Sequence, residues 1–510
     1  MGKIASPSGK FAVTMDHRLD PGPQRWADLK SLFAAPRIAL SDAAVANVVR
    51  AHDFLQEVVA SGRTVYGVNT GFGQLAHVRV GEDELHQLQD NILRSHAAGL
   101  GTPLPPEVVR WMLLFKVCGL IRGHSGVQPQ TVDRLVDFYN EGLMPVVPRQ
   151  GSLGASGDLA PLSHMCLPLL GEGELMEQEA DGQWTTRPAA EVLKEKGWSP
   201  ISLGPKEGLA LINGTQMMSA LLACGLQQLE SLWSQAHGVA SLSLAAFEGL
   251  DAPFHPAVHD LRQHAGQEAS AAEMRSWLDG AAFLRETHEW VQDPYSFRCI
   301  PQVYGAVRKA MDLGIETLEG EATAVTDNPI LLPETGEVIS AGNFHGEPLA
   351  VILDHLKVVA SELGTMSERR IFKLLSGTRG LPPFLATDPG LDSGLMIVQY
   401  TAASIVARNK MRAMPASVDT IDSSNGQEDH VSMGANAGLQ MLAVIEGTRE
   451  ILASELLTAS QALHFRPEPG LSNRQSEWLK AFRMEVPPQE GDVEQSSRMR
   501  AAVRFLVPKA

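Results

Sequence analysis

A long apolar seam in the second half of the chain constrains the fold more than any other feature. Apolar residues recur there at alternating spacings of three and four: Leu349, Ile352, Leu356, Val359, Leu363 and Met366. This spacing is typical of a long helix that packs against other helices along its length. Residues 436–464 repeat the pattern with Leu442, Ile445, Leu452 and Leu456. The second half is therefore predicted to be a bundle of long helices packed at shallow angles.

The first half is more mixed. Residues 39–61 read as an amphipathic helix with Ser41 as its N-cap, and residues 105–120 as a helix that is apolar nearly all round. Short strands are expected only near Val338-Ile339 and at residues 183–187. The prediction is a mainly α protein with a loop-rich N-terminal domain, 1–205, followed by a helix bundle with C-terminal helices, 206–510.

The net charge and the spacing of the cysteines limit the kinds of partner and metal site that are expected for this chain. The formal net charge of −17 over 510 residues argues against nucleic acid, and a carboxylate ligand would need a local Arg or Lys inside a pocket. The four cysteines lie far apart with no CxxC pair, which indicates neither a disulfide framework nor a zinc site. Without a signal peptide or membrane-length apolar run, the sequence predicts a cytoplasmic protein with no membrane partner.

Three familiar motifs are nearly matched. Gly71-Phe-Gly-Gln-Leu-Ala76 fits GxGxxA but lacks the strand and helix that a dinucleotide site requires. Gly154-Ala-Ser-Gly-Asp158 begins like a nucleophile elbow but ends in Asp158 instead of glycine. No HExxH pair occurs, so no metal is predicted.

The chemistry that Ala155-Ser-Gly157 permits is unusual. Because Gly157 has no Cβ, its backbone nitrogen could close a five-membered ring onto the carbonyl of Ala155. Loss of two waters, one of them from Ser156, would leave an exocyclic methylidene. That group is an electrophile, which no ordinary side chain supplies. The alternative is a purely structural turn of small residues that leads into a helix.

Gly151-Ser-Leu-Gly-Ala-Ser-Gly-Asp-Leu-Ala-Pro-Leu-Ser-His164 closely resembles the signature of the ammonia-lyases and aminomutases that use a methylidene-imidazolone group. Further matching motifs occur in the same order along the chain: Tyr66-Gly-Val-Asn-Thr-Gly-Phe-Gly73, Asn213-Gly-Thr-Gln216, Gln292-Asp-Pro-Tyr-Ser-Phe-Arg298, Asp327-Asn-Pro329, Gly342-Asn-Phe-His345 and Gln427-Glu-Asp-His430. The resemblance implies the helical fold of the ammonia-lyase and fumarase-like superfamily. It also implies a homotetramer with shared active sites, and a methylidene-imidazolone formed autocatalytically from Ala155, Ser156 and Gly157 with no external cofactor.

The resemblance also implies roles for other residues. The β-proton of an amino acid is barely acidic, so elimination needs a positioned base, and Tyr66 matches the family's loop tyrosine. Arg298 is expected to grip the substrate carboxylate, because a guanidinium can hold it bidentately. Asn213 and Tyr295 match family residues that contact the prosthetic group or the substrate's amino and carboxylate ends. By the same resemblance, Gln292 and Phe344 line this region.

Two positions bear on the substrate. His96 could bond an imidazole or a phenol, and it argues against phenylalanine, which would leave it unsatisfied. Glu428 suits an imidazole N–H and resembles histidine lyases, whereas tyrosine and phenylalanine lyases tend to carry Asn-Gln-Asp there. Arg94 points towards some tyrosine lyases, and Ser424-Asn-Gly426 departs from the histidine pattern.

The sequence therefore predicts conversion of L-histidine to trans-urocanate and ammonia, with Glu428 also a candidate in proton transfer. A tyrosine ammonia-lyase and a related aromatic aminomutase are the alternatives. A non-catalytic helical assembly protein is the rival from another class. The helical lyases that form fumarate-type products are a fold rival, but their GSSxMPxKxN loop is missing.

Overall fold

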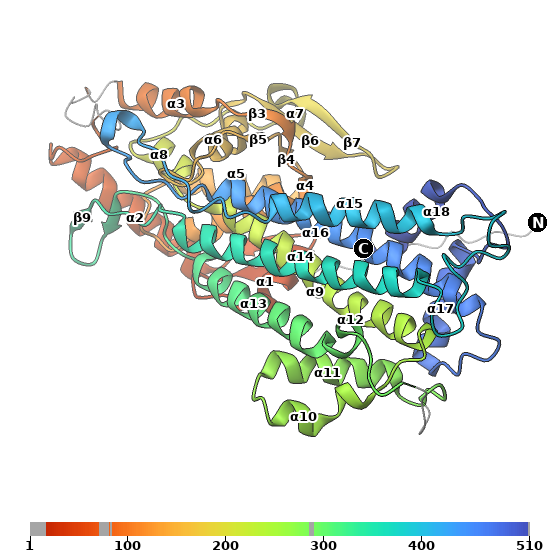
Figure 1. Cartoon of the computed structure of the whole chain (residues 1–510). Coiled ribbons are helices and arrows are strands. Elements are labelled where there is room, and N and C mark those ends of the chain that lie inside the picture. The colour runs from red at the N-terminus through yellow and green to blue at the C-terminus, as the bar shows by residue number, and fades with distance from the viewer. Residues whose placement is uncertain (1–16, 71–80, 82–83, 285–289, 508–510) are drawn as a thin grey trace, which may run out of the picture. The chain divides into compact units, whose positions relative to one another are not determined.

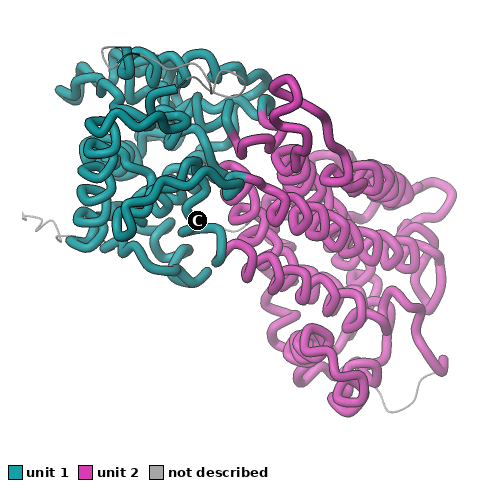
Figure 2. Tube along the Cα trace, turned by 90° about the vertical axis from the view of Figure 1, so that its left-hand side faces the viewer, with its two compact units in different colours: residues 1–151, 159–216, 319–344 teal, residues 152–158, 217–318, 345–510 magenta. Residues whose placement is uncertain are grey.

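The computed structural model describes residues 17–70, 81, 84–284 and 290–507. The near-match at Gly71–Ala76 and the last three residues of the Tyr66–Gly73 motif lie outside these ranges. Two compact units divide the chain (Figure 2). Unit 1 comprises residues 1–151, 159–216 and 319–344, and unit 2 comprises residues 152–158, 217–318 and 345–510. The predicted division at residue 205 concerns consecutive domains, which this grouping does not test, and it stays a prediction.

Unit 1 combines short helices with short strands. Its α-helices are α1 (Trp26–Ala34), α2 (Asp42–Ala60), α3 (Leu85–His96), α4 (Pro106–Leu120), α5 (Pro129–Asn140), α6 (Leu159–Cys166), α7 (Ala189–Lys196) and α8 (Glu207–Ile212). A 3-10 turn, η3 (Leu167–Leu170), follows α6. The Ser41 hydroxyl accepts a hydrogen bond from the Ala44 amide at 3.2 Å, which confirms it as the N-cap of α2. Helix α4 is buried from Val108 to Leu120 except at Arg110, as its apolar sequence predicts.

All the strands lie in unit 1 and form small sheets. A parallel pair joins β1 (His17–Leu19) to β2 (Ile38–Leu40). Antiparallel pairing joins β3 (Leu100–Pro103) to β5 (Pro148–Gln150), and β8 (Ile330–Leu332) to β9 (Glu337–Ile339). A three-stranded antiparallel sheet has the order β4 (Met144–Pro145), β6 (Glu174–Gln178), β7 (Trp184–Pro188).

Unit 2 consists of helices and the loops that connect them, with no strand among its described residues. The long helices are α9 (Gln216–Ala246), α13 (Ile300–Glu321), α14 (Glu347–Leu375), α15 (Met396–Arg412) and α16 (Gly434–His464). The shorter elements are η4 (Ala252–Phe254), α10 (Pro256–Asp260), α11 (Ala265–Leu278), α12 (Tyr295–Arg298), η5 (Ser424–Gly426), α17 (Asn473–Glu485) and α18 (Gln495–Phe505).

Small residues let the long helices pack closely, and Figure 1 shows these helices running alongside one another. A side chain at Gly225 of α9 would overlap Met441 of α16, and one at Gly314 of α13 would press on Leu226 of α9. Helix α14 packs against both α15 and α16. The seam on α14 lies inward as predicted, because Leu349, Ile352, Leu356 and Leu363 are buried.

The mainly α fold class is confirmed, and so are the helices predicted at 39–61, 105–120 and 436–464 and the strands near 183–187 and 338–339. The expectation that strands occur only in those two places is wrong, since unit 1 also contains β1 to β6 and β8. These strands are two to five residues long, too short for an alternating pattern to show in the sequence. None of the described helices is long and apolar enough to cross a membrane.

Candidate active site

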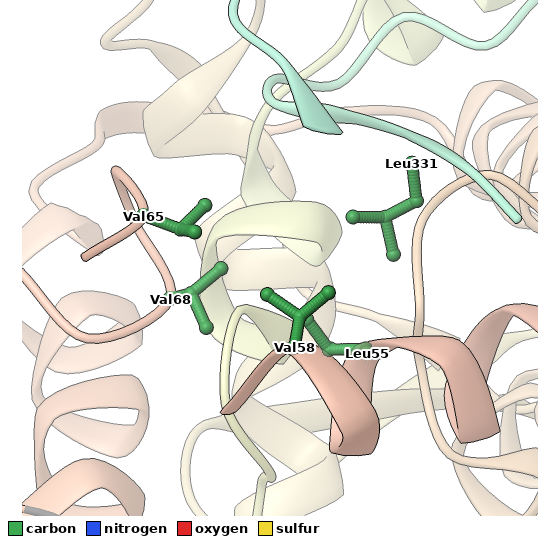
Figure 3. Packing of buried hydrophobic residues seen from close by; sticks show 5 residues of the cluster. All are labelled: Leu55, Val58, Val65, Val68 and Leu331. Carbon is green, nitrogen blue, oxygen red and sulfur yellow. The ribbon is translucent and has the colours of Figure 1, made fainter. Parts of the chain in front are cut away.

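The loop of Tyr66 is anchored by the valines on either side of it. Val65 and Val68 are buried against Leu55 and Val58 of α2 and Leu331 of β8 (Figure 3). Tyr66 itself is only half-buried. The apolar neighbours therefore fix the backbone of the loop and leave the phenol side chain partly accessible.

Hydrogen bonds fix the same loop. The side chain of Asn69 accepts from the Val65 amide at 2.9 Å and donates to the Arg63 carbonyl at 2.8 Å. The Thr70 hydroxyl accepts from the Gly67 amide at 3.1 Å. Gly67 has φ +69°, a conformation that glycine adopts at little cost. The Gly and Asn residues of the motif thus fix the backbone on both sides of the half-buried Tyr66.

His96 ends α3 and is half-buried. Its Nδ1 lies 2.9 Å from the Ile92 carbonyl and 3.0 Å from the Ser95 hydroxyl. A carbonyl only accepts, so the neutral ring carries its proton on Nδ1, and Nε2 is then an acceptor. That acceptor suits a donor such as an imidazole N–H or a phenol.

Asn213 lies at the C-terminal end of α8 and is buried. The buried ammonium of Lys116, on α4, donates to the carbonyls of Ala210 and Asn213 at 3.2 and 3.3 Å. The last carbonyls of a helix have no partner within it, so Lys116 satisfies the end of α8 and holds Asn213 in place.

Three of the sequence motifs meet within unit 1. Gln216 donates to the Thr326 hydroxyl at 3.0 Å, next to the Asp327-Asn-Pro329 motif. Asn328 accepts from the Ala341 amide at 2.7 Å, and Asn343 donates to the Val325 carbonyl at 3.2 Å. These bonds join the loop that carries the half-buried Phe344 to the segment that follows α13.

The glycine-rich turn at residues 152–158 is tied down at several points in unit 2. The Met433 amide donates to the Leu153 carbonyl at 2.8 Å, and Ala155 packs against Val431 and Met433. Gly154 and Gly157 have φ of +69° and +76°. A side chain at Gly154 would overlap the Ser432 hydroxyl. Only glycine therefore suits Gly154, both by its backbone conformation and by the space around it.

Within this turn, Ser156 meets the residue predicted to select the substrate. The Ser156 hydroxyl donates to Oε1 of Glu428 at 2.8 Å. The other carboxylate oxygen, Oε2, accepts from the Ser423 hydroxyl at 3.0 Å, and backbone bonds join residues 423 and 428 in both directions. Ser156 and Glu428 are both half-buried. The carboxylate is thus oriented on both of its oxygens, with one directed at Ser156.

The Gln292–Arg298 segment presents alternate residues outward. Asp293, Ser296 and Phe297 are buried, whereas Gln292 is exposed and Tyr295 is 70% exposed. The Arg298 guanidinium lies 4.6 Å from the centre of the Tyr295 ring, within the range of a cation–π contact. Its buried Nε has no hydrogen-bond partner among the described residues. A planar cation with an unsatisfied donor is suited to a carboxylate.

The structure brings Ser156 to Glu428 and Tyr295 to Arg298 in unit 2. In unit 1 it places four other residues on different helices and loops: Tyr66, His96, Asn213 and Phe344. The chemical roles of these residues stay predictions.

Asp158 is a residue whose role the sequence reasoning missed. Its carboxylate is fully buried and accepts from the Ser152 hydroxyl at 3.1 Å and from the Met218 amide at 3.0 Å. It therefore fixes the turn that contains Ser156. The signal was a carboxylate directly after a run of small residues, where a solvated side chain has no obvious use.

Comparison with known proteins identifies the family of the chain. The model of the family described as "Aromatic amino acid lyase" matches residues 25–484. A histidine ammonia-lyase of Geobacillus thermodenitrificans is 48% identical over 436 residues, which are 85% of each chain.

Solved structures resemble the fold over nearly the full length. A histidine ammonia-lyase of Trypanosoma cruzi superposes with a TM-score of 0.88 at 37% identity, covering 96% of this chain and 93% of its own. A tyrosine aminomutase of Streptomyces globisporus gives a TM-score of 0.91 at 32% identity, covering 96% and 97%. The matched motifs, the family model and the relatives agree, and the chain belongs to the aromatic amino acid lyase family.

Proposed function

We propose that this chain eliminates ammonia from L-histidine and releases trans-urocanate, the first step of histidine degradation. The observation that carries the proposal is the 2.8 Å hydrogen bond between Ser156 and Glu428. It joins the residue proposed to become the electrophile to a carboxylate suited to an imidazole N–H. Relatives named histidine ammonia-lyase, among them the one 48% identical over 85% of this chain, support the same substrate.

The turn fits an internally formed methylidene-imidazolone ring. Gly157 has no side chain to obstruct its nitrogen, and its φ of +76° is one that L-residues rarely adopt. Ala155 and Gly157 are buried, while Ser156 between them is half-buried, so the turn is held on both sides of the serine. The ring would be an electrophile that accepts electrons from the bound substrate and thereby activates it.

The remaining residues would hold the substrate and move its proton. Tyr66, on its anchored loop, would take the β-proton as general base. Arg298 would bind the substrate carboxylate through its two-pronged guanidinium, steadied by the ring of Tyr295. The other polar contacts to substrate or prosthetic group would come from Asn213 and Gln292, with Phe344 against the apolar part.

His96 supports a substrate with a donor at its far end. In the tautomer that donates from Nδ1 to the Ile92 carbonyl, Nε2 is the acceptor atom of the ring. An imidazole N–H or a tyrosine hydroxyl would satisfy it, whereas a phenyl ring would not. Tyrosine is therefore the second candidate substrate, for a lyase or an aminomutase.

An apolar surface on unit 2 supports a homotetramer with shared active sites. Large apolar side chains are exposed on α14 and α15 and just after α15: Val351, Val358, Phe372, Ile397, Tyr400, Met411, Met414 and Val418. A set of this kind is typical of a surface that another subunit covers. All four cysteines are free thiols, which supports the reducing cytoplasm as the place of action.

Glu428→Gln tests the assignment. The substitution keeps the shape and hydrogen-bonding reach of the side chain but removes its charge. We expect kcat/KM for L-histidine to fall by about 10- to 100-fold, the usual cost of losing a charge-assisted hydrogen bond. The measurement is the initial rate of urocanate formation.

Asp429→Asn is the matched control, because it removes one exposed negative charge from the same loop. It is expected to retain the rate within about twofold, as is usual for an exposed charge. Equal rates in both variants would remove Glu428 from recognition and from proton transfer.

A further inference from the structure

A buried network in unit 2 meets the back of the segment that presents Tyr295 and Arg298. Arg370 of α14 is fully buried and donates from Nη1 to the Ser296 carbonyl at 3.0 Å. Ser296 lies in α12 between Tyr295 and Phe297. The buried guanidinium thus holds the main chain of the short helix whose outer face presents the proposed substrate-binding residues.

Arg370 is itself held on every nitrogen. Its Nε and Nη2 form a two-pronged pair with Glu455 of α16, at 2.6 and 2.8 Å. Nη2 also donates to the hydroxyl of Tyr304 on α13 at 2.7 Å. The hydroxyl of Ser243, on α9, donates to Glu455 at 2.6 Å. The network therefore joins residues from four long helices, α9, α13, α14 and α16.

The surroundings of Arg370 favour its charged form. Burial alone would lower the pKa of Arg370, but Glu455 and Tyr304 outweigh it and raise the pKa above its ordinary value. Burial raises the pKa of Tyr304 to about 12. The guanidinium therefore stays charged and the phenol stays protonated at moderate pH.

Helix α12 needs support from outside itself. It has only four residues, and a helix this short forms too few internal hydrogen bonds to be stable alone. Phe297 stacks on Phe247 with ring centres 4.7 Å apart, and Arg379 pairs with Asp293 at 2.7 Å. These contacts hold the side chains of the segment, while Arg370 binds its main chain directly between Tyr295 and Arg298.

We propose that Arg370, fixed by Glu455, is a positioning residue that sets the place of Arg298 and Tyr295 through the Ser296 carbonyl. The inference rests on the proposed function, in which Arg298 binds the substrate carboxylate. A displacement of about 1 Å at a positioning contact can cost about 100-fold in rate. Loss of the network should therefore weaken carboxylate binding specifically, without a general loss of the fold.

The test replaces both charges at once with Arg370→Met together with Glu455→Met. Removing one partner would leave a buried charge unpaired and could unfold the protein, whereas replacing a buried pair by apolar groups of similar size often preserves stability. Arg483→Met is the matched control, because Arg483 also donates from a partly buried position to a helix carbonyl, and both of its described hydrogen bonds go to Ser460 of α16.

The readout is inhibitor affinity, which does not require turnover. Urocanate carries the carboxylate and histamine lacks it, while both carry the imidazole. We expect the double variant to bind urocanate at least about 10-fold more weakly, in line with loss of a positioned contact, and histamine within about twofold of the wild type. The control variant should change neither.

Equal weakening of both ligands would overturn the proposal, because it would show a general structural effect, and so would unchanged binding of both. The outcome is separable from the proposed function. If the wild type turned over tyrosine instead of histidine, coumarate and tyramine would replace the two probes, and the comparison with and without carboxylate would stand.

Discussion

Ser156, Tyr66 and Tyr295 share one local design, in which a half-buried or exposed side chain lies next to buried residues. Ser156 lies between buried Ala155 and Gly157, and Tyr66 lies close to buried Val65 and Val68. Packing of the neighbours fixes the backbone, while the Ser156 hydroxyl bonds to Glu428 and the Tyr295 ring lies against Arg298. Selection at these positions can then follow chemistry, while the neighbours carry the fold.

Gly154 tests the design of the turn at the scale of one residue. Gly154→Ala places a side chain at φ +69° and against the Ser432 hydroxyl. We expect it to lower the free energy of unfolding by about 2–5 kcal/mol, the sum of a left-handed backbone and an overpacked contact. We also expect the substitution to hinder ring formation, which removes two water molecules from the chain. Intact mass spectrometry would then show a smaller fraction of the protein at the mass reduced by two waters.

Gly142→Ala is the control, because Gly142 has φ +67° but open space around it. It should cost only about 1–2 kcal/mol, the backbone share alone, and leave the mass unchanged. Urea unfolding gives both free energies. The account of the turn would be contradicted if both variants lost the same free energy of unfolding and both showed the full mass decrease of two waters.

The sequence identified Ser156 by its chemistry and Glu428 by resemblance, but it did not predict their contact. The two residues are 272 positions apart, and only the packing of the loop after α15 brings them to 2.8 Å. Asp158 and Arg370 were missed for a related reason. A buried charged residue looks like a solvated one in the sequence until its partners are known.

At the scale of elements, prediction succeeded where a pattern ran for several turns. The seam on α14 and the apolar α4 were found because a helical period repeats over many residues. Strands β1 to β6 and β8 were missed. Residues such as Met144-Pro145 form a strand only through their partner β6. Such pairing is a tertiary effect with no local sequence signal.

The exposed face of α14 carries a prediction at this scale. Val351 and Val358 lie seven residues apart on one side of the helix and are 54% and 40% exposed. If another subunit covers them, Val351→Glu with Val358→Glu should convert a tetramer into smaller species, since it would bury two unpaired carboxylates. Light scattering after size-exclusion chromatography measures the mass.

Val258→Glu with Leu261→Glu is the matched pair of charges, placed at exposed apolar residues near α10. It should leave the tetramer intact. A wild-type monomer, or a tetramer that survives both pairs of substitutions equally well, would contradict the assignment of this face.

At the scale of the whole molecule, each of the two compact units is made of segments that are not continuous in the sequence. Residues 319–344 return to unit 1 after the chain has entered unit 2, and residues 152–158 belong to unit 2. The proposed reactive turn is therefore an excursion of seven residues from one unit into the other. Such returns depend on long-range packing, so a sequence read from end to end gives the fold class but not this exchange.

The central claim is elimination of ammonia from L-histidine, and substrate discrimination tests it most directly. The purified chain would be incubated separately with L-histidine, L-tyrosine and L-phenylalanine at mildly alkaline pH, while ultraviolet absorbance follows the conjugated acrylate product. The account predicts urocanate from L-histidine and no product from the other two. Coumarate from L-tyrosine without urocanate would contradict the assignment of L-histidine as substrate. No product from any of the three amino acids would contradict the lyase activity itself.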